Sequence, residues 1–461
     1  MPRILFFSST PRSAKTLSRS HDHRRPRDRC PANTLTMLHL DISTALAKVI
    51  TPSFGVSNEE LTQMRTSIKR HIEQWLQERE KGEHAWSMDP YNKSALDRVV
   101  STANHIKKEK MQTVVWLGIG GSGLGPKVIE EVFESSQSLE FIVIDTIDPA
   151  LLELYLGVLD WNQTFIVVAS KSGETLETMS TFFLMWEKLV QARGKRAKDR
   201  VVAITDKQSG ALRDFSLEQD IEMLHIPSGV GGRYSIFTPI GLLPLALLSG
   251  DTEEFLRGAK EMDTCCQNTV LEENPAALLA AVQYILDTKR GLPIRIIMPY
   301  TQKLRSIALW NQQLIAESLG KTELSNPIPM AAIGTQDQHS LLQQWMAGPR
   351  KSWHIFIRDR EKPSITVPNV EDARFAHISK KPFADLLEAC YEGTTQALTK
   401  AKRPHVTITI PTLDAYHLGQ LFFCFLAEVI FLGKIYRIDP YDQPGVEVGK
   451  TITKNILSGE K

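Results

Sequence analysis

The chain has 461 residues, with 54 lysines and arginines against 53 aspartates and glutamates, and 42% of the residues are hydrophobic. This length favours two or three packed domains, and the balanced charge gives no reason to expect a nucleic acid or an anionic membrane as partner. The five cysteines show no C-x-x-C spacing, so neither a zinc site nor a disulfide framework is indicated, and the cytoplasm is the expected compartment.

The chain begins with two segments of different character. Residues 1–36 contain seven arginines and lack apolar periodicity, so we expect a disordered basic extension. Residues 37–104 form an N-terminal helical segment, because apolar side chains recur with helical spacing, most clearly over residues 60–80. No strand is expected before residue 104.

From residue 105 onward, short β-rich runs alternate with longer helical runs, which predicts parallel sheets covered by helices on both faces. We expect a first α/β domain at 105–255, a second at 256–410 and a C-terminal helical segment at 411–461. The expected strands are MQTVVWLGIG, LEFIVIDTI, TFIVVAS, RVVAITD and IEMLHIPSG in the first domain, and PIRIIMPY, WHIFIRD and HVTITIP in the second.

Residues 418–433 (LGQLFFCFLAEVIFLG) form the most apolar stretch of the chain. The stretch is shorter than the roughly 20 residues that a membrane span needs, and it contains Glu428. We therefore expect a buried helix rather than a membrane helix.

A glycine-rich loop follows the first expected strand. Gly118-Ile-Gly-Gly121-Ser122-Gly satisfies G-x-G-x-x-G, and glycines so placed let backbone N–H groups approach an anion at a helix N-terminus. A dinucleotide is one possible ligand, since Asp145 ends the next strand near the place of a ribose-binding carboxylate. A different phosphate would suit the loop equally well.

A second candidate anion loop, SKSGETLET at 170–178, follows the third expected strand. Hydroxyl groups and N–H groups at a helix N-terminus suit a phosphate monoester, whereas an ordinary N-cap is the alternative. Its substrate-binding candidates are Ser170, Lys171, Ser172, Thr175 and Thr178.

Six motifs occur in a familiar order: GIGGSGLGP at 118–126, SKSGETLET at 170–178, VGGRYSIFTPIGLLPLAL at 230–247, NQQLIAESLGK at 311–321, GTQDQHSLLQ at 334–343 and DQPGVEVGK at 442–450. From about residue 85 to the C-terminus, the chain resembles the glucose-6-phosphate isomerase (phosphoglucose isomerase) family. Gly173-Glu174, in place of the Phe-Thr pair usual in eukaryotic members, and Pro444, where many members have Trp, make it similar to the bacterial type.

The resemblance implies two sugar-isomerase (SIS-type) doubly wound parallel-sheet domains with helical arms. It implies reversible conversion of glucose 6-phosphate to fructose 6-phosphate through an enediolate, in glycolysis and gluconeogenesis. No metal or cofactor is required. The expected assembly is a homodimer whose active sites are shared between subunits.

The same resemblance assigns roles to individual residues. Glu317 moves the proton between C1 and C2, and Gln313, four residues earlier on the same helix face, binds substrate. His339 and Lys450 assist ring opening, and Arg233, after two glycines, stabilises the developing enediolate charge. Further substrate-binding candidates are Gly121, Ser122 and Gln443.

Two functions from other classes remain open on the sequence. A sugar-phosphate sensor would share the α/β fold but would not need Glu317, His339 and Lys450 together. An NAD-dependent dehydrogenase would use the glycine loop for a dinucleotide.

Overall fold

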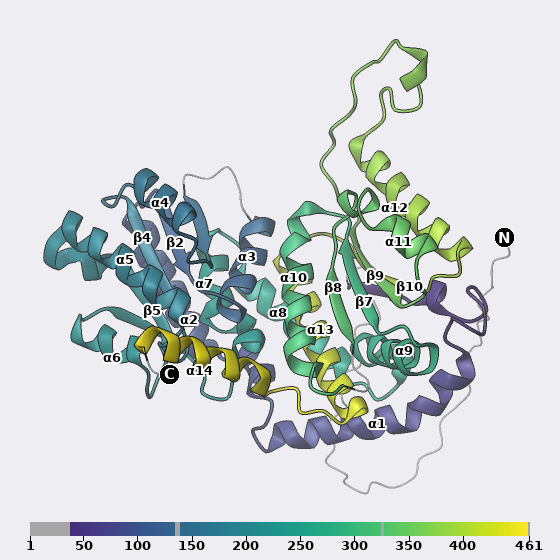
Figure 1. The fold of residues 1–461 in the computed structure, drawn as a ribbon, viewed down its shortest axis with the longest axis horizontal. Helices are drawn as coiled ribbons and strands as arrows, with labels where there is room; N and C mark the ends of the chain where they lie inside the picture. Colours follow the sequence, from purple (N-terminus) through teal and green to yellow (C-terminus); the bar gives the residue numbers. More distant parts are fainter. Residues whose placement is uncertain (1–36, 134–138, 324–326, 460–461) are drawn as a thin grey trace, which may run out of the picture.

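The computed structural model describes residues 37–133, 139–323 and 327–459 (Figure 1). The expected disordered extension at 1–36 lies outside these residues. Two five-stranded sheets stand side by side, and α8, α10 and α13 lie between them, as the ribbon shows. The doubly wound α/β architecture predicted from the alternating pattern is therefore confirmed.

The first sheet is wholly parallel, with the strand order β3-β2-β4-β5-β6. Its strands are β2 (Thr113–Leu117), β3 (Glu140–Ile144), β4 (Thr164–Ala169), β5 (Val201–Asp206) and β6 (Glu222–Ile226). Counted within the domain this order is 2-1-3-4-5, the flavodoxin-like order, and differs from the 3-2-1-4-5-6 order of dinucleotide-binding folds. The topology thus disfavours the dehydrogenase hypothesis.

Both faces of the first sheet are buried because side chains alternate along each strand. Val114 and Trp116 belong to one core cluster, whereas Val115 and Leu117 belong to another. The first cluster includes side chains of α2 (Lys93–Lys108), α3 (Gly121–Phe133) and α7 (Pro239–Leu247). The second includes side chains of α4 (Pro149–Val158), α5 (Leu176–Arg193) and α6 (Ala211–Glu218).

The second sheet has the order β1-β10-β9-β7-β8, in which only β1 is antiparallel. Its strands are β1 (His39–Asp41), β7 (Ile294–Pro299), β8 (Ile328–Ala331), β9 (Ser352–Asp359) and β10 (His405–Ile410). Around it lie α9 (Pro275–Arg290), α10 (Arg305–Leu319), α11 (Leu342–Ala347) and α12 (Phe383–Lys400).

Two edge strands were not expected from the sequence. Residues 37–104 were predicted to be helical, yet β1 pairs with β10 before α1 (Asn58–Glu80) begins. β8 has only four residues and contains Pro329, which is tolerated at a sheet edge. Both strands are too short to carry a recognisable alternation, and their partners lie far away along the chain.

The apolar stretch at 418–433 lies inside α13 (Ala415–Tyr436), and every residue of that stretch is buried. α13 is long and apolar enough to span a membrane, but it packs against α1, α8 (Thr252–Cys266), α9 and α10. Glu428 of α13 is fully buried and forms an ion pair with Arg295 of β7. The expectation of a buried helix is confirmed.

Candidate functional site

Glu317 lies in the last turn of α10, which ends at Leu319 and has Gly320 as its C-cap. Its Oε2 accepts a hydrogen bond of 3.0 Å from Nη1 of Arg233, and its Oε1 accepts one of 2.8 Å from Nε2 of Gln313. The Glu317 side chain keeps 30% of its surface exposed, whereas that of Arg233 keeps only 3%. The carboxylate is thus held in one orientation while remaining accessible to a small molecule.

Arg233 lies in the 3-10 helix η4 (Gly232–Phe237), which follows the first sheet, so the ion pair joins the two domains. Its Nη1 also donates to Oε1 of Gln443 (2.8 Å), and its Nη2 donates to the carbonyl oxygens of Pro440 (2.7 Å) and Asp442 (3.1 Å). These bonds fix the guanidinium plane and bring the predicted residue Gln443 to the same cluster. A guanidinium held this way can stabilise negative charge without rearranging.

Two supporting residues escaped the sequence reasoning. Ser318 Oγ accepts a hydrogen bond of 2.8 Å from Nε of Arg233, and the hydroxyl of Tyr234 lies 3.0 Å from the same Oγ. The Tyr234 hydroxyl donates to the Pro440 carbonyl (2.9 Å), and burial raises the pKa of Tyr234 to about 12. Their adjacency to Glu317 and Arg233 in the sequence is the only signal that could have indicated them.

The glycine loop after β2 packs tightly against this cluster. Gly120 has a φ of +57°, and a Cβ there would lie 2.9 Å from Nε2 of Gln313. A Cβ on Gly121 would lie 2.2 Å from the carbonyl carbon of Gly232. The glycines therefore allow the loop backbone to approach η4 and α10 closely. Close packing and anion binding both require glycines here, so the G-x-G-x-x-G pattern alone does not tell the two roles apart.

Ser122 lies in the first turn of α3, beside Gly121. Its carbonyl oxygen accepts a hydrogen bond of 2.8 Å from Trp116 Nε1. Its hydroxyl makes no hydrogen bond with any residue that the structure describes, and the residue is half-buried. The hydroxyl is thus free to bind a ligand at this helix N-terminus.

The second loop leaves the carboxyl end of β4, next to β2 in the sheet. In open parallel sheets, ligands bind where the strand order reverses, which here is between β2 and β4. Topology therefore brings the loops at 118–123 and 170–178 side by side at the carboxyl ends of β2 and β4. This convergence is independent of the motif resemblance.

The side chains of the 170–178 loop differ in their surroundings. Ser170 is buried, and its Oγ lies 3.1 Å from Thr175 Oγ1 and accepts a bond of 3.1 Å from Gly173 N–H. Ser172 is exposed. Thr178 Oγ1 is buried and has no hydrogen-bond partner in the part of the chain that the structure describes.

The N-terminus of α5 has no capping hydrogen bond from its N-cap side chain. Thr175 occupies the N-cap position but makes no side-chain capping bond, so N–H donors of the first turn remain available to an anion. Lys171 donates to the carbonyl oxygens of Ser228 (2.7 Å) and Val230 (2.9 Å), which ties this loop to the segment before Arg233. Burial lowers the pKa of Lys171.

His339 and Lys450 are not brought to this cluster within one chain. His339 is exposed and follows the 3-10 helix η7 (Gln336–Gln338), three residues before α11 begins. Lys450 is exposed on α14 (Pro444–Ser458), where its ammonium group lies 2.9 Å from Glu447 Oε1. Neither side chain forms a hydrogen bond or ion pair with Glu317, Arg233, Gln313 or Gln443 within the described ranges.

One group of potential metal ligands occurs among the described residues: Glu78, Glu83 and His84. Glu78 Oε2 already binds the Lys434 ammonium at 2.5 Å and His84 Nε2 at 2.8 Å. A lysine ammonium thus supplies the positive charge that a metal would bring. The group contains none of the predicted site residues.

Comparison with known proteins identifies the family. The family described as phosphoglucose isomerase matches residues 88–357 and 391–461. Glucose-6-phosphate isomerase of Carboxydothermus hydrogenoformans is 34% identical over 405 residues, covering 83% of this chain and 87% of that protein. The enzyme of the same name from Rubrobacter xylanophilus is 35% identical over 381 residues, covering 79% and 87%.

Solved structures agree with this assignment. A hypothetical protein from Thermus thermophilus superposes with a TM-score of 0.83 at 29% identity, covering 91% of this chain and all of that one. A glucose-6-phosphate isomerase from Chlamydia trachomatis superposes with a TM-score of 0.71 at 25% identity, covering 79% and 73%. With the family match spanning most of its length, the chain belongs to the phosphoglucose isomerase family.

Proposed function

We propose that this chain interconverts glucose 6-phosphate and fructose 6-phosphate in sugar metabolism. The observation that carries the proposal is the partly exposed Glu317 carboxylate, held between Arg233 and Gln313 where the glycine loop after β2 meets α10. Family membership gives the reaction class, and this geometry supports Glu317 as the base of that reaction. The reaction needs a base, an anion site and a fixed cation, but no metal or redox cofactor.

In this proposal Glu317 transfers the proton between C1 and C2 of the open-chain sugar. Its carboxylate accepts a hydrogen bond at each oxygen, so its orientation is set before substrate arrives. Gln313 Oε1 is buried and accepts no hydrogen bond from a described residue, which leaves it free for a substrate hydroxyl. One α10 face thus carries both the base and a substrate-binding amide.

Arg233 stabilises the enediolate that forms when the proton leaves carbon. Its guanidinium is immobilised by five hydrogen bonds to Glu317, Ser318, Gln443, Pro440 and Asp442. A preorganised cation of this kind lowers the energy of developing negative charge more than a mobile one. Arg233 therefore acts electrostatically, without donating or accepting a proton.

The substrate phosphate binds between the loops at 118–123 and 170–178. The Ser122 hydroxyl, the exposed Ser172, the unpartnered Thr178 hydroxyl and the uncapped N-terminus of α5 support this placement. Gly121 contributes by permitting close contact between the loop and η4. The sugar would then extend toward Glu317.

We assign ring opening to His339 and Lys450, with His339 supplied by the second subunit of a homodimer. The exposure of both side chains, and their separation from the Glu317 cluster, support a site completed by another chain. α14 leaves the cluster at Gln443, and none of its residues is buried. We also place the enzyme in the cytoplasm, which cell fractionation followed by an activity assay would test.

Production of glucose 6-phosphate from fructose 6-phosphate, coupled to glucose-6-phosphate dehydrogenase, tests the activity directly. Turnover by the purified chain is expected. Binding of fructose 6-phosphate without turnover would instead indicate the sensor function. Binding of NADH, detected through a change in its fluorescence, would support the dehydrogenase hypothesis.

Subunit complementation tests the shared site. Glu317→Ala and His339→Ala should each be inactive alone, but mixed dimers contain one site with both residues intact. Activity should therefore return after subunit exchange, with exchange verified by energy transfer between labelled subunits. Verified exchange without activity would refute the shared site and leave the isomerase proposal standing.

A further inference from the structure

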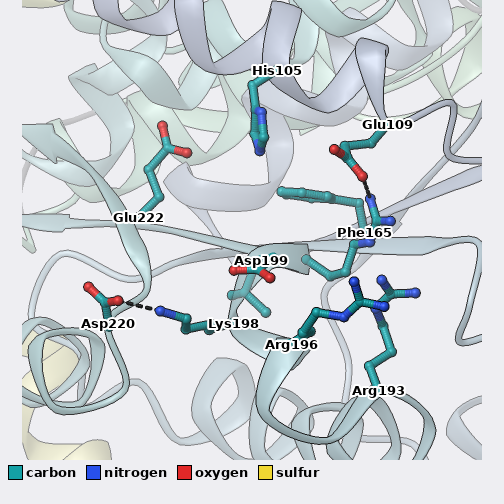
Figure 2. A pocket seen from close by; sticks show the side chains of 11 residues that line it. His105, Glu109, Phe165, Arg193, Arg196, Lys198, Asp199, Asp220 and Glu222 are labelled. Atoms are coloured by element: carbon teal, nitrogen blue, oxygen red, sulfur yellow. Dashed lines mark hydrogen bonds and ion pairs between the residues drawn. The ribbon is translucent and has the colours of Figure 1, made fainter.

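A polar pocket lies at the amino ends of strands of the first sheet (Figure 2). The cavity measures about 410 Å³, and its lining includes Phe165, Val201 and Glu222. These residues lie at or next to the amino ends of β4, β5 and β6, whereas the candidate active-site loops leave the carboxyl ends of β2 and β4. The pocket is therefore separate from the site built around Glu317.

Three arginines and a lysine of one short segment line this pocket. Arg193 ends α5, and Arg196, Lys198 and Arg200 follow in the 3-10 helix η3 (Gly194–Arg200). Figure 2 shows the guanidinium groups of Arg193 and Arg196 side by side. Burial and the positive charges of Arg200 and Arg196 lower the pKa of Arg193, as expected where like charges crowd together.

The donors of these arginines are incompletely satisfied. The side chain of Arg200 is 9% exposed, and its Nη1 lies 2.6 Å from Glu109 Oε2, yet its buried Nε has no hydrogen-bond partner among the described residues. Nε of Arg193 is also buried without a partner there. Arg196 makes no hydrogen bond or ion pair with any described residue. Unsatisfied buried donors are uncommon in native proteins, and a ligand with several acceptor oxygens would satisfy them.

Two of the four acidic residues of the pocket form ion pairs with cations of the same lining. Glu109 pairs with Arg200, and Asp220 pairs with Lys198 (Figure 2). Glu222 accepts a hydrogen bond of 2.5 Å from Thr102 Oγ1. Of the lining residues, Arg193 and Arg196 form no ion pair with a described residue, and the carboxylates of Asp199 and Glu222 have no cationic partner there either. The guanidinium donors that lack a partner are thus concentrated in this one part of the pocket lining.

We propose that this pocket binds a small phosphorylated metabolite, with its phosphoryl oxygens on Arg193 and Arg196. Planar guanidinium groups match phosphate oxygens in pairs, and the cavity volume suits a small molecule rather than a flat macromolecular surface. The acids of the pocket would repel an extended polyanion such as a nucleic acid. The site requires no contribution from the isomerase residues.

Titration calorimetry of the full chain with pyrophosphate tests the proposal. Saturating fructose 6-phosphate occupies the proposed substrate site, and ionic strength is matched with NaCl. Pyrophosphate should bind the wild-type chain. The double variant Arg193→Ala/Arg196→Ala should bind it at least tenfold more weakly, because two charge-assisted contacts are lost. Arg213→Ala is the matched control, because Arg213 is an arginine of α6 that pairs with Asp214 on the surface of the same domain.

Two results would overturn the site. One is no binding of pyrophosphate to the wild-type chain, which would mean that the arginines only neutralise Glu109 and the carboxyl end of α5. The other is equal binding to the wild type, the double variant and Arg213→Ala, which would place pyrophosphate elsewhere. The coupled isomerase assay on the double variant should show an unchanged KM for fructose 6-phosphate, so this test fails or succeeds independently of the proposed function.

Discussion

In the first sheet, the polar residues of interest lie beyond the strand ends, whereas in the second sheet several ionisable groups are sealed between strands and helices. Ser170 directly follows β4, and the glycine loop directly follows β2. Arg295 of β7, His354 of β9 and His405 of β10 are instead at most 1% exposed. Polar groups of the first sheet thus lie where a ligand could reach them, whereas ionisable groups of the second sheet lie inside the core.

A comparison of two Arg–Glu pairs shows the same contrast. Arg233–Glu317 lies at the junction of the two domains with its carboxylate partly open to solvent, and Arg295–Glu428 lies in the core with both partners at 0–1% exposure. Removing one partner should affect catalysis in the first case and stability in the second. Each prediction below tests that division.

Glu317→Gln should show the largest effect. Loss of a general base lowers turnover by roughly 10²–10⁴-fold, and the amide keeps the shape that contacts Arg233 and Gln313. Steady-state assays should show this loss in kcat, while calorimetric binding of fructose 6-phosphate and the melting temperature stay near wild type. Wild-type turnover would remove Glu317 from the mechanism.

Glu428→Ala should destabilise the fold by about 3–5 kcal/mol, because the Arg295 charge would remain buried without its partner. Urea unfolding would measure this change in the free energy of unfolding. Glu254→Ala is the control: Glu254 pairs with Arg257 on the surface, and its loss should cost at most about 1 kcal/mol. Similar losses in the two variants would contradict the distinction between the sealed and exposed pairs.

The free energy of unfolding should decrease as the pH is lowered below about 6.5, because the second sheet contains buried histidines. Burial lowers the pKa of His354 to about 3 and that of His405 to about 4. Below pH 6.5 each of these histidines binds a proton in the unfolded chain but not in the folded chain. Each histidine therefore lowers the free energy of unfolding by about 1.4 kcal/mol per pH unit, until the pH reaches its pKa in the folded chain.

His354→Phe tests this dependence, since His354 lies against the rings of Trp345 and Phe356 and both its nitrogens lack partners among the described residues. Urea unfolding between pH 4 and 7 should show a shallower decline for this variant. The exposed His377→Gln should keep the wild-type slope. An unchanged slope in His354→Phe would mean that this histidine does not contribute.

Ser172→Asp should have the smallest effect of the series, raising the KM for fructose 6-phosphate on the order of tenfold through repulsion of the phosphate. Ser180→Asp is the control, because Ser180 is also exposed but lies farther along α5. An unaltered KM in Ser172→Asp would show that the phosphate binds elsewhere. A KM raised equally in both variants would indicate a long-range charge effect.

The sequence was sufficient to predict eight strands, the buried α13 and the order of the motifs. Each of these depends on local periodicity or on residues close together in the chain, as in β4, which is apolar after Thr164, or the α10 face bearing Gln313 and Glu317. β1 and β8 were missed because short edge strands are defined by their partners rather than by their own pattern.

Only the tertiary structure decided which polar residues meet. It joined Arg233 to Glu317, brought Gln443 from the far end of the chain to the same guanidinium, and supplied Ser318 and Tyr234 as supports. It also gathered Arg193, Arg196 and Arg200 around a cavity with residues from α2 and β6. Such contacts depend on strand order and domain packing, and a linear pattern carries no record of either because the partners are up to 210 residues apart.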